Sequence, residues 1–185
     1  QYDKPVKSLH FVTDQINGTT ELIDPLILVV ESQIDSIRKI QGVLEFAIKN
    51  NESLLIIADL DPQVLAALAM NKMKGNIKVC VVDAPTYGFT KKEKLEDIAM
   101  MTGATVINED LGDDMDLIEP IHLGRATKSI SGQYDTIIQI KETPKGVKNL
   151  IKEINERLST EKIPGFKIAL EKRLGLLAAK VAIVK

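Results

Sequence analysis

The feature of this 185-residue chain that most restricts its fold is a series of short, continuously apolar segments. Two of them occupy residues 26–30 and 54–58, and further strand signals, which include Lys78 and Thr105, follow at 77–82 and 105–107. Uninterrupted apolar runs of this length are typical of strands that are buried on both faces. Because patterns with helical periodicity separate them, the sequence predicts an α/β fold with a parallel βαβ core.

Helix signals fill the intervals between these strands. The spacing of the apolar residues predicts a first helix over 32–49. Asp61 and Pro62 suit the N-cap and the first position of a second helix, which runs to about residue 73. Thr90 opens a third helix with a capping box.

The two flanks of this core carry a different pattern. Residues 1–30 and 105–140 contain short strand and turn signals, among them 9–12 and 134–140. These signals indicate additional β structure packed beside the parallel core. The expected fold class is therefore α/β, with a parallel βαβ core and flanking β structure.

The last part of the chain returns to helices. We expect a single domain over residues 1–185, in which 160–185 forms a C-terminal helix and strand. The chain begins at Gln1 and ends within the apolar run 181–184. We therefore expect it to be a piece of a longer protein, leading at its end toward a further domain.

Charge and cysteine content exclude several classes of protein. There are 24 basic and 26 acidic side chains, a net charge of -2, which argues against nucleic acid or an anionic membrane as the partner. No uncharged apolar stretch approaches the ~18 residues of a membrane span. A single cysteine, Cys80, cannot form an intrachain disulfide and is typical of a reducing compartment.

Catalytic signals are few. None of the strand-to-helix junctions carries a glycine-rich phosphate loop. The histidines, His10 and His122, lie far apart without partners at metal-ligand spacing, and Cys80 lies within a buried strand. We therefore expect no cofactor and no resident metal in this chain.

One junction leaves an enzymatic alternative open. Asp59 and Asp61 follow a buried strand, as do the paired carboxylates of haloacid-dehalogenase-type, magnesium-dependent phosphohydrolases. In that interpretation Asp59 attacks phosphorus and Asp61 acts as acid and base, but Gln63 stands where a threonine is expected. In the structural interpretation Asp61 caps a helix and Asp59 forms a turn.

The first two helices have more apolar surface than packing on a sheet requires. Residues 64–70 are continuously apolar and cover the whole circumference of a helix at about 100° per residue. Two interpretations remain open at this point. Either the surrounding layers bury both helices, or a groove between them receives apolar segments of another chain.

The sequence strongly resembles the apical domain of the GroEL-type group I chaperonins of bacteria, mitochondria and plastids. The likeness extends over the whole chain, without the helical protrusion of group II chaperonins. The stretches that carry it are ELIDP at 21–25, LLIIA at 54–58, NKMKG at 71–75, VCVVDAP at 79–85 and LEDIAMMTG at 95–103.

This resemblance implies the layered β/β/α fold of that apical domain and a binding function. In the family, the two helices and an extended segment before them bind non-native polypeptides and then the mobile loop of a GroES-type cochaperonin. The full-length chaperonin, the parent of such a domain, forms a ring that assists ATP-driven protein folding. The residues at the corresponding positions here are Val6, His10, Phe11, Gln41, Leu44, Leu65, Ala69, Met70 and Asn71. Lys4 stands where the family has an arginine used in an inter-subunit ion pair.

Some positions depart from the family pattern. Gln41, His10 and Val6 replace larger or more apolar groups, so the groove is expected to be less apolar than usual. The resemblance also implies that ATP and magnesium bind only to the parent, outside this chain, and that the parent forms a heptameric single or double ring. The fragment is expected to be a monomer without ATPase activity, located in the bacterial cytoplasm, or in mitochondria or plastids.

Overall fold

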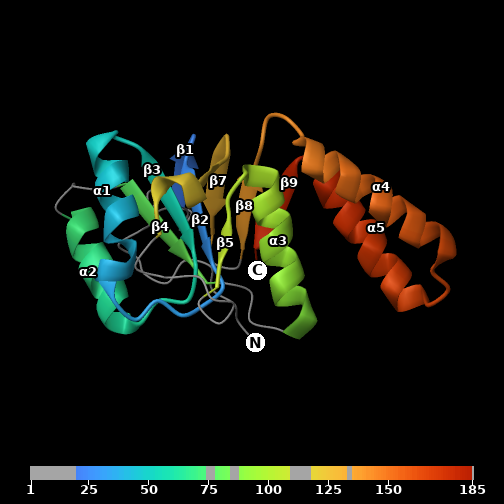
Figure 1. Cartoon of the computed structure of the whole chain (residues 1–185), viewed down its shortest axis with the longest axis horizontal. Coiled ribbons are helices and arrows are strands. Elements are labelled where there is room, and N and C mark those ends of the chain that lie inside the picture. Colours follow the sequence, from blue (N-terminus) through green and yellow to red (C-terminus); the bar gives the residue numbers. More distant parts are fainter. Residues whose placement is uncertain (1–19, 74–77, 84–87, 109–117, 133–134, 185) are drawn as a thin grey trace.

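Two β-sheets packed against each other form the centre of the protein (Figure 1). The computed structural model describes residues 20–73, 78–83, 88–108, 118–132 and 135–184, with the backbone alone for 71–73, 88–91 and 184. The first sheet has the parallel order β4-β3-β2-β5, and a short strand, β6, pairs antiparallel with β2. Its strands are β2 (Leu26–Val30), β3 (Ser53–Ile57), β4 (Lys78–Val82), β5 (Val106–Ile107) and β6 (Gly124–Arg125).

The second sheet is antiparallel and has the order β1-β7-β8-β9. Its strands are β1 (Thr20–Ile23), β7 (Lys128–Ser131), β8 (Thr136–Gln139) and β9 (Val181–Val184). The mixed α/β architecture with a parallel core and flanking β structure is thus confirmed. The predicted strand at 9–12 lies outside the described residues.

The parallel sheet is apolar on both faces because successive side chains of a strand point to opposite sides. Leu28 and Ile56 lie on one face, under the helices that follow β2 and β3. Ile27 and Leu55 lie on the other face, in a cluster shared with the antiparallel sheet and three further helices. Two sets of apolar side chains therefore hold three layers together.

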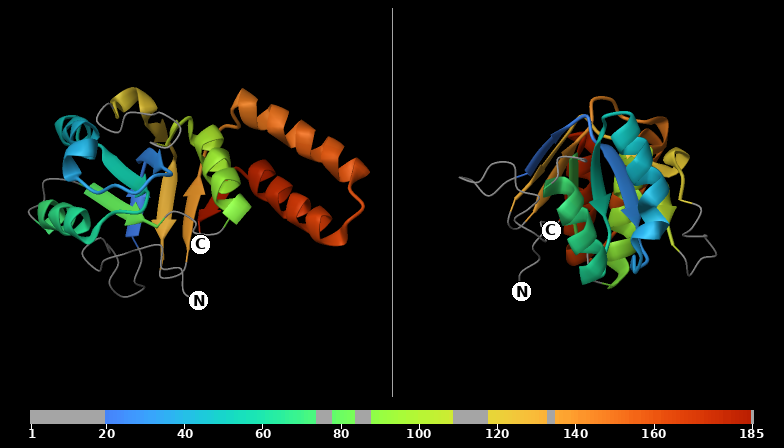
Figure 2. Two further views of the ribbon diagram at one scale, coloured as in Figure 1. Left: turned by 60° about the horizontal axis from the view of Figure 1, so that its bottom comes forward. Right: turned by 90° about the vertical axis from the view of Figure 1, so that its left-hand side faces the viewer.

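The helices occupy both ends of this stack (Figures 1 and 2). The 3₁₀ turn η2 and helices α1 and α2 cover the outer face of the parallel sheet, and α3 packs against the other face. Helices α4 and α5 form an antiparallel hairpin that extends from the opposite end of the molecule. Their bounds are η2 (Ile37–Ile40), α1 (Gln41–Lys49), α2 (Pro62–Met73), α3 (Gly88–Thr102), η5 (Pro120–His122), α4 (Lys145–Thr160) and α5 (Pro164–Ala178).

The first helix is shorter than the sequence predicts. Instead of a helix over 32–49, the chain is extended before η2, and α1 begins only at Gln41. The Ile34 amide donates to the Asp59 carbonyl at 2.8 Å, and the Asp61 amide donates to the Ile34 carbonyl at 3.0 Å. This β-bridge beyond the end of β3 satisfies backbone groups that a helix would have used, so the prediction for 32–36 is wrong.

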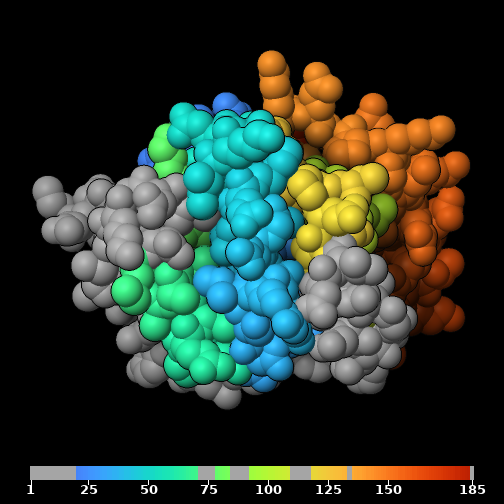
Figure 3. Space-filling view, turned by 60° about the vertical axis from the view of Figure 1, so that its left-hand side comes forward, coloured from blue at the N-terminus to red at the C-terminus, as the bar shows by residue number. Residues whose placement is uncertain are grey.

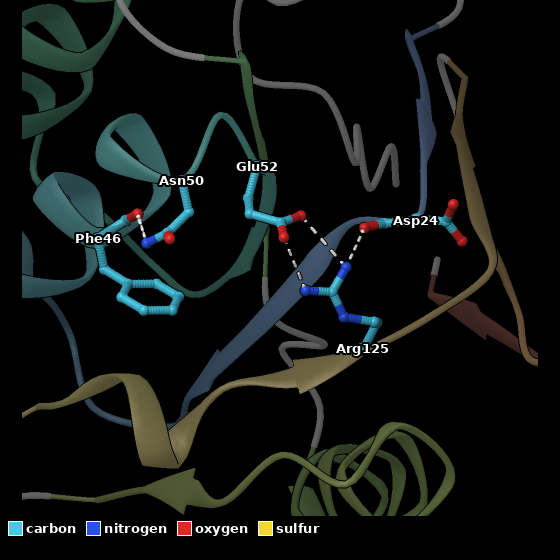
Figure 4. A network of polar contacts seen from close by, with 5 residues as sticks. All are labelled: Asp24, Phe46, Asn50, Glu52 and Arg125. Atoms are coloured by element: carbon cyan, nitrogen blue, oxygen red, sulfur yellow. Dashed lines mark hydrogen bonds and ion pairs between the residues drawn. The ribbon is translucent and has the colours of Figure 1, made fainter.

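Arg125 on β6 ties two turns of the fold together (Figure 4). Its guanidinium donates to both carboxylate oxygens of Glu52, at 3.1 and 3.2 Å, and to the carbonyl oxygen of Asp24 at 3.0 Å. Asp24 has a φ of 48°, in the left-handed region. The Asn50 amide donates to the Phe46 carbonyl at 2.8 Å and closes the end of α1.

No helix in the described part of the chain is both long and apolar enough to cross a bilayer.

Candidate helix groove

Helix α2 faces the segment before α1 through a polar side chain. The Gln63 amide donates to the Asp35 carbonyl at 3.3 Å. Ala67 and Met70 follow Gln63 at four and seven residues, so they share its face of the helix. We call the surface between this face of α2 and residues 35–48 the helix groove; a pocket lies at its start.

The opposite wall belongs to α1. A Cβ on Gly42 would lie 3.6 Å from the Ile118 carbonyl, so this side of α1 faces away from α2. Gln41, Leu44 and Ile48, spaced by three and four residues, share another side of α1, on which Gln41 and Ile48 are exposed and Leu44 is buried. Figure 3 looks onto this surface, with α2 (green) beside the segment that enters α1 (blue to cyan).

The helix groove exposes large apolar side chains above a buried apolar cluster. Met70 is 58% exposed and Ile48 is 47% exposed, although both are large apolar side chains. Leu44 is only 7% exposed and belongs to the cluster beneath the two helices. The exposed Gln41 donates its amide to the Glu45 carboxylate at 3.1 Å, which satisfies its polar group without burying it.

Both helices start at the same end of the groove, because each connects parallel strands of one sheet. A shallow pocket of about 260 Å³ lies at this end, lined by Asp35, Ser36, Ile37, Gln63 and Val64. The Asp35 carboxylate forms an ion pair with Lys39 at 3.0 Å. The hydrogen bond and the charge of Lys39 hold the pKa of Asp35 below its usual value, so the carboxylate is ionised at neutral pH.

The residues proposed from the sequence do not all lie in one place. Gln41 on α1 and Met70 on α2 are exposed at the surface of the two helices, whereas Leu44 is buried beneath it. Leu65 and Ala69 lie on another side of α2, where Leu65 is partly buried and Ala69 is 7% exposed. Outside the described residues are Lys4, Val6, His10, Phe11 and the side chain of Asn71.

Three groove residues were missing from the sequence-based set. Gln63 and Ala67 on α2 and Ile48 on α1 share faces with the residues that were named. The helical spacing from Met70 and Leu44 could have identified them, but only if the facing sides of the two helices were known.

Asp59 and Asp61, the paired carboxylates of the phosphohydrolase hypothesis, form hydrogen bonds with other residues of the chain. Asp61 accepts a hydrogen bond from the Gln33 amide, while its carbonyl accepts the Leu65 amide at 3.0 Å and so begins α2. Gln63, in place of the expected threonine, binds Asp35. Among the described residues, no group of three or more histidine, cysteine or acidic side chains could hold a metal ion.

A second polar contact joins the carboxyl ends of two parallel strands. The Asn108 amide, just after β5, donates to Glu31 at 2.9 Å, and the Ser32 hydroxyl donates to Asn108 at 3.1 Å. Both contacts hold β2 and β5 together at their ends, which is a structural use of these polar groups.

No protein-family model matches the chain.

Proposed function

We propose that this chain is a polypeptide-binding module of the chaperonin apical type. Its groove captures apolar segments of non-native polypeptides, and the mobile loop of a GroES-type cochaperonin binds to the same surface. ATP and magnesium would act in a ring-forming parent. The observation that carries this proposal is the exposure of Met70 and Ile48 along a groove between two adjacent helices.

The chemistry of the groove suits a receptor for many sequences. Aliphatic and methionine side chains gain free energy from buried area, about 25 cal/mol per Å², without directional contacts that select one ligand. The neighbouring polar groups of Gln41 and Gln63 already have partners within the chain. Binding should therefore follow apolar area rather than a defined sequence.

A fluorescence titration with a labelled amphipathic peptide tests the proposal. Met70→Ser removes an exposed apolar side chain from the rim, so the affinity should fall about fivefold to tenfold. Ile23→Ser on β1 is a matched control, because Ile23 is 59% exposed and lies on the other sheet. Equal affinities of both variants and the original chain would contradict the proposal.

The phosphohydrolase alternative has a separate assay. With magnesium and a generic phosphomonoester, we expect only background turnover from a binding module. The turnover should be the same for Asp59→Asn as for the original chain. Turnover that Asp59→Asn abolishes would favour the enzyme instead.

A further inference from the structure

An exposed apolar surface lies at the end of the α4–α5 hairpin, in residues 161–169, which we call the hairpin tip. Ile163, Phe166 and Ile168 are between 54% and 64% exposed. They occupy the loop before α5 and its first turns, where every residue from 162 to 169 is exposed. Large apolar side chains that gather on a projecting element are typical of a contact surface.

The hairpin tip is presented on a firm base. Arg173, lower on α5, donates to both carboxylate oxygens of Asp97 on α3, at 2.6 and 2.7 Å. Leu170 and Leu177 of the same helix are buried in the cluster between the layers. The free end of α5 therefore projects from an anchored helix and loses little conformational entropy on binding.

The hairpin is positively charged although the whole chain is not. Residues 145–178 contain eight basic and four acidic side chains, whereas the rest of the chain contains 16 basic and 22 acidic ones. Helix α3, which packs against the base of the hairpin, is balanced, with three lysines and three carboxylates. The net charge of -2 therefore conceals a hairpin of +4 beside a body of -6. Such an asymmetry is typical of an element that meets an anionic partner.

The charges at the hairpin tip follow the same direction. Lys162 and Lys167 are exposed on either side of Phe166. Glu161 is the acidic residue of the tip, and its carboxylate accepts the backbone amides of Lys162 and Ile163, both at 3.1 Å. Because these bonds hold the carboxylate at the N-terminal end of α5, its charge is compensated by the helix itself. The tip thus presents two ammonium groups around an apolar centre.

This combination is suited to the surface of an anionic lipid bilayer. Nucleic acid has the negative charge but no apolar layer for the isoleucines, and an uncharged apolar surface makes no use of the cations. Five residues separate Ile163 from Ile168, a length of about 7.5 Å along a helix axis. Peripheral proteins bury apolar side chains to a similar depth, about 5–10 Å, at the boundary between headgroups and acyl chains.

We propose that the hairpin tip docks the protein on an anionic bilayer. Phe166 and the two isoleucines enter the boundary between headgroups and acyl chains, while Lys162 and Lys167 extend to the anionic headgroups. The helix groove lies at the other end of the long axis of the molecule (Figure 1). A docked copy therefore keeps its groove free for polypeptides, and docking does not depend on the proposed function.

Co-sedimentation with vesicles of phosphatidylcholine, with or without about 30% phosphatidylserine, tests the proposal. Three partly inserted side chains bind more weakly than one myristoyl chain, so half of the protein should bind at about 1 mM of the anionic lipid mixture. Phe166→Ser should weaken this binding about tenfold, and Lys162→Gln combined with Lys167→Gln at least about fivefold. Ile23→Ser is the control, because Ile23 is 59% exposed on another element. Equal binding to neutral vesicles, or undiminished binding of Phe166→Ser, would overturn the proposal.

A tryptophan reporter shows whether the tip itself enters the bilayer. The chain has no tryptophan, so Phe166→Trp introduces a single one at the tip. Its emission should shift to shorter wavelength on anionic vesicles and be quenched by lipids with brominated acyl chains, whereas Ile23→Trp should show neither effect. Unchanged Phe166→Trp emission would overturn the proposal. So would self-association without lipid that Phe166→Ser abolishes, because it would assign the tip to a second copy of the chain.

Discussion

Gly124 shows how closely β6 approaches the end of α3. A Cβ at this position would lie 2.6 Å from both the Ala104 nitrogen and the Thr102 carbonyl oxygen. These are backbone atoms, and the Thr102 hydroxyl beside them donates to the Ile98 carbonyl at 2.8 Å. No small movement of a side chain can make room, so only glycine fits.

Gly124→Ala should therefore lower the free energy of unfolding by about 2 kcal/mol or more, measured by urea denaturation. Gly175→Ala is the control, because a Cβ at this position in α5 meets nothing within 4 Å. Alanine favours a helix interior over glycine, so the control should be neutral or stabilising by up to about 1 kcal/mol. Equal effects of the two substitutions would disprove the close approach.

Single residues also show what the sequence could and could not predict about the site. Met70 and Gln41 were expected at the binding surface because of the family resemblance, and both side chains are exposed, but the continuously apolar run 64–70 gives no spacing that selects one face. Gln63 was considered only as a departure from a phosphatase motif. Its contact with Asp35, 28 residues earlier, depends on how two segments meet in space, and no local pattern contains that information.

Among the elements, α3 and α5 are joined by an ion-pair network centred on Arg173. Asp97 and Glu93, one turn apart on α3, both accept from its guanidinium. Burial by itself would lower the pKa of Arg173, but the hydrogen bonds and charge of Asp97, with the charges of Glu93 and Glu153, outweigh it and raise the pKa. The guanidinium therefore stays charged and fastens the hairpin to the rest of the molecule.

Replacing this side chain should loosen the hairpin. Arg173→Gln leaves a half-buried Asp97 carboxylate without its cation, so the expected loss is about 2 kcal/mol of unfolding free energy. Arg173→Lys keeps the charge but loses the two-pronged geometry, and it should lose roughly half as much. Hydrogen exchange should increase first in α4 and α5. An increase that spares both helices would contradict the role of this network.

The boundaries of the elements were predictable to different degrees. Helix α2 covers the predicted residues 62–73 because its start signal, Asp61 followed by Pro62, is local. The segment 32–36 was predicted as helix and is extended, because Ile34 bonds to the backbone around Leu60 instead. Local periodicity could not reveal this competing partner, which lies 26 residues further along the chain.

At the scale of the whole molecule, both sheets contribute to one apolar cluster. Leu55 and Cys80 from the parallel sheet share it with Leu22 and Ile138 from the antiparallel sheet. Helices α3, α4 and α5 add further side chains to the same cluster. Because no layer can separate without exposing this surface, the layers should unfold together.

Cys80 offers a direct probe of this cooperativity, because it is the only cysteine and is fully buried. A thiol reagent should label it only when the protein opens globally, at the rate of unfolding measured by circular dichroism in the same urea concentration. Labelling that is much faster than global unfolding would show that the sheets separate independently.

The central claim is that the α1–α2 groove is the polypeptide-binding surface. Methyl NMR on protein labelled at isoleucine and methionine, titrated with an amphipathic peptide at low protein concentration, tests it most directly. We expect the signals of Met70 and Ile48 to shift on binding, while those of Ile23 and Ile168 stay in place. Shifts confined to Ile163 and Ile168 at the hairpin tip, with Met70 and Ile48 unchanged, would contradict it.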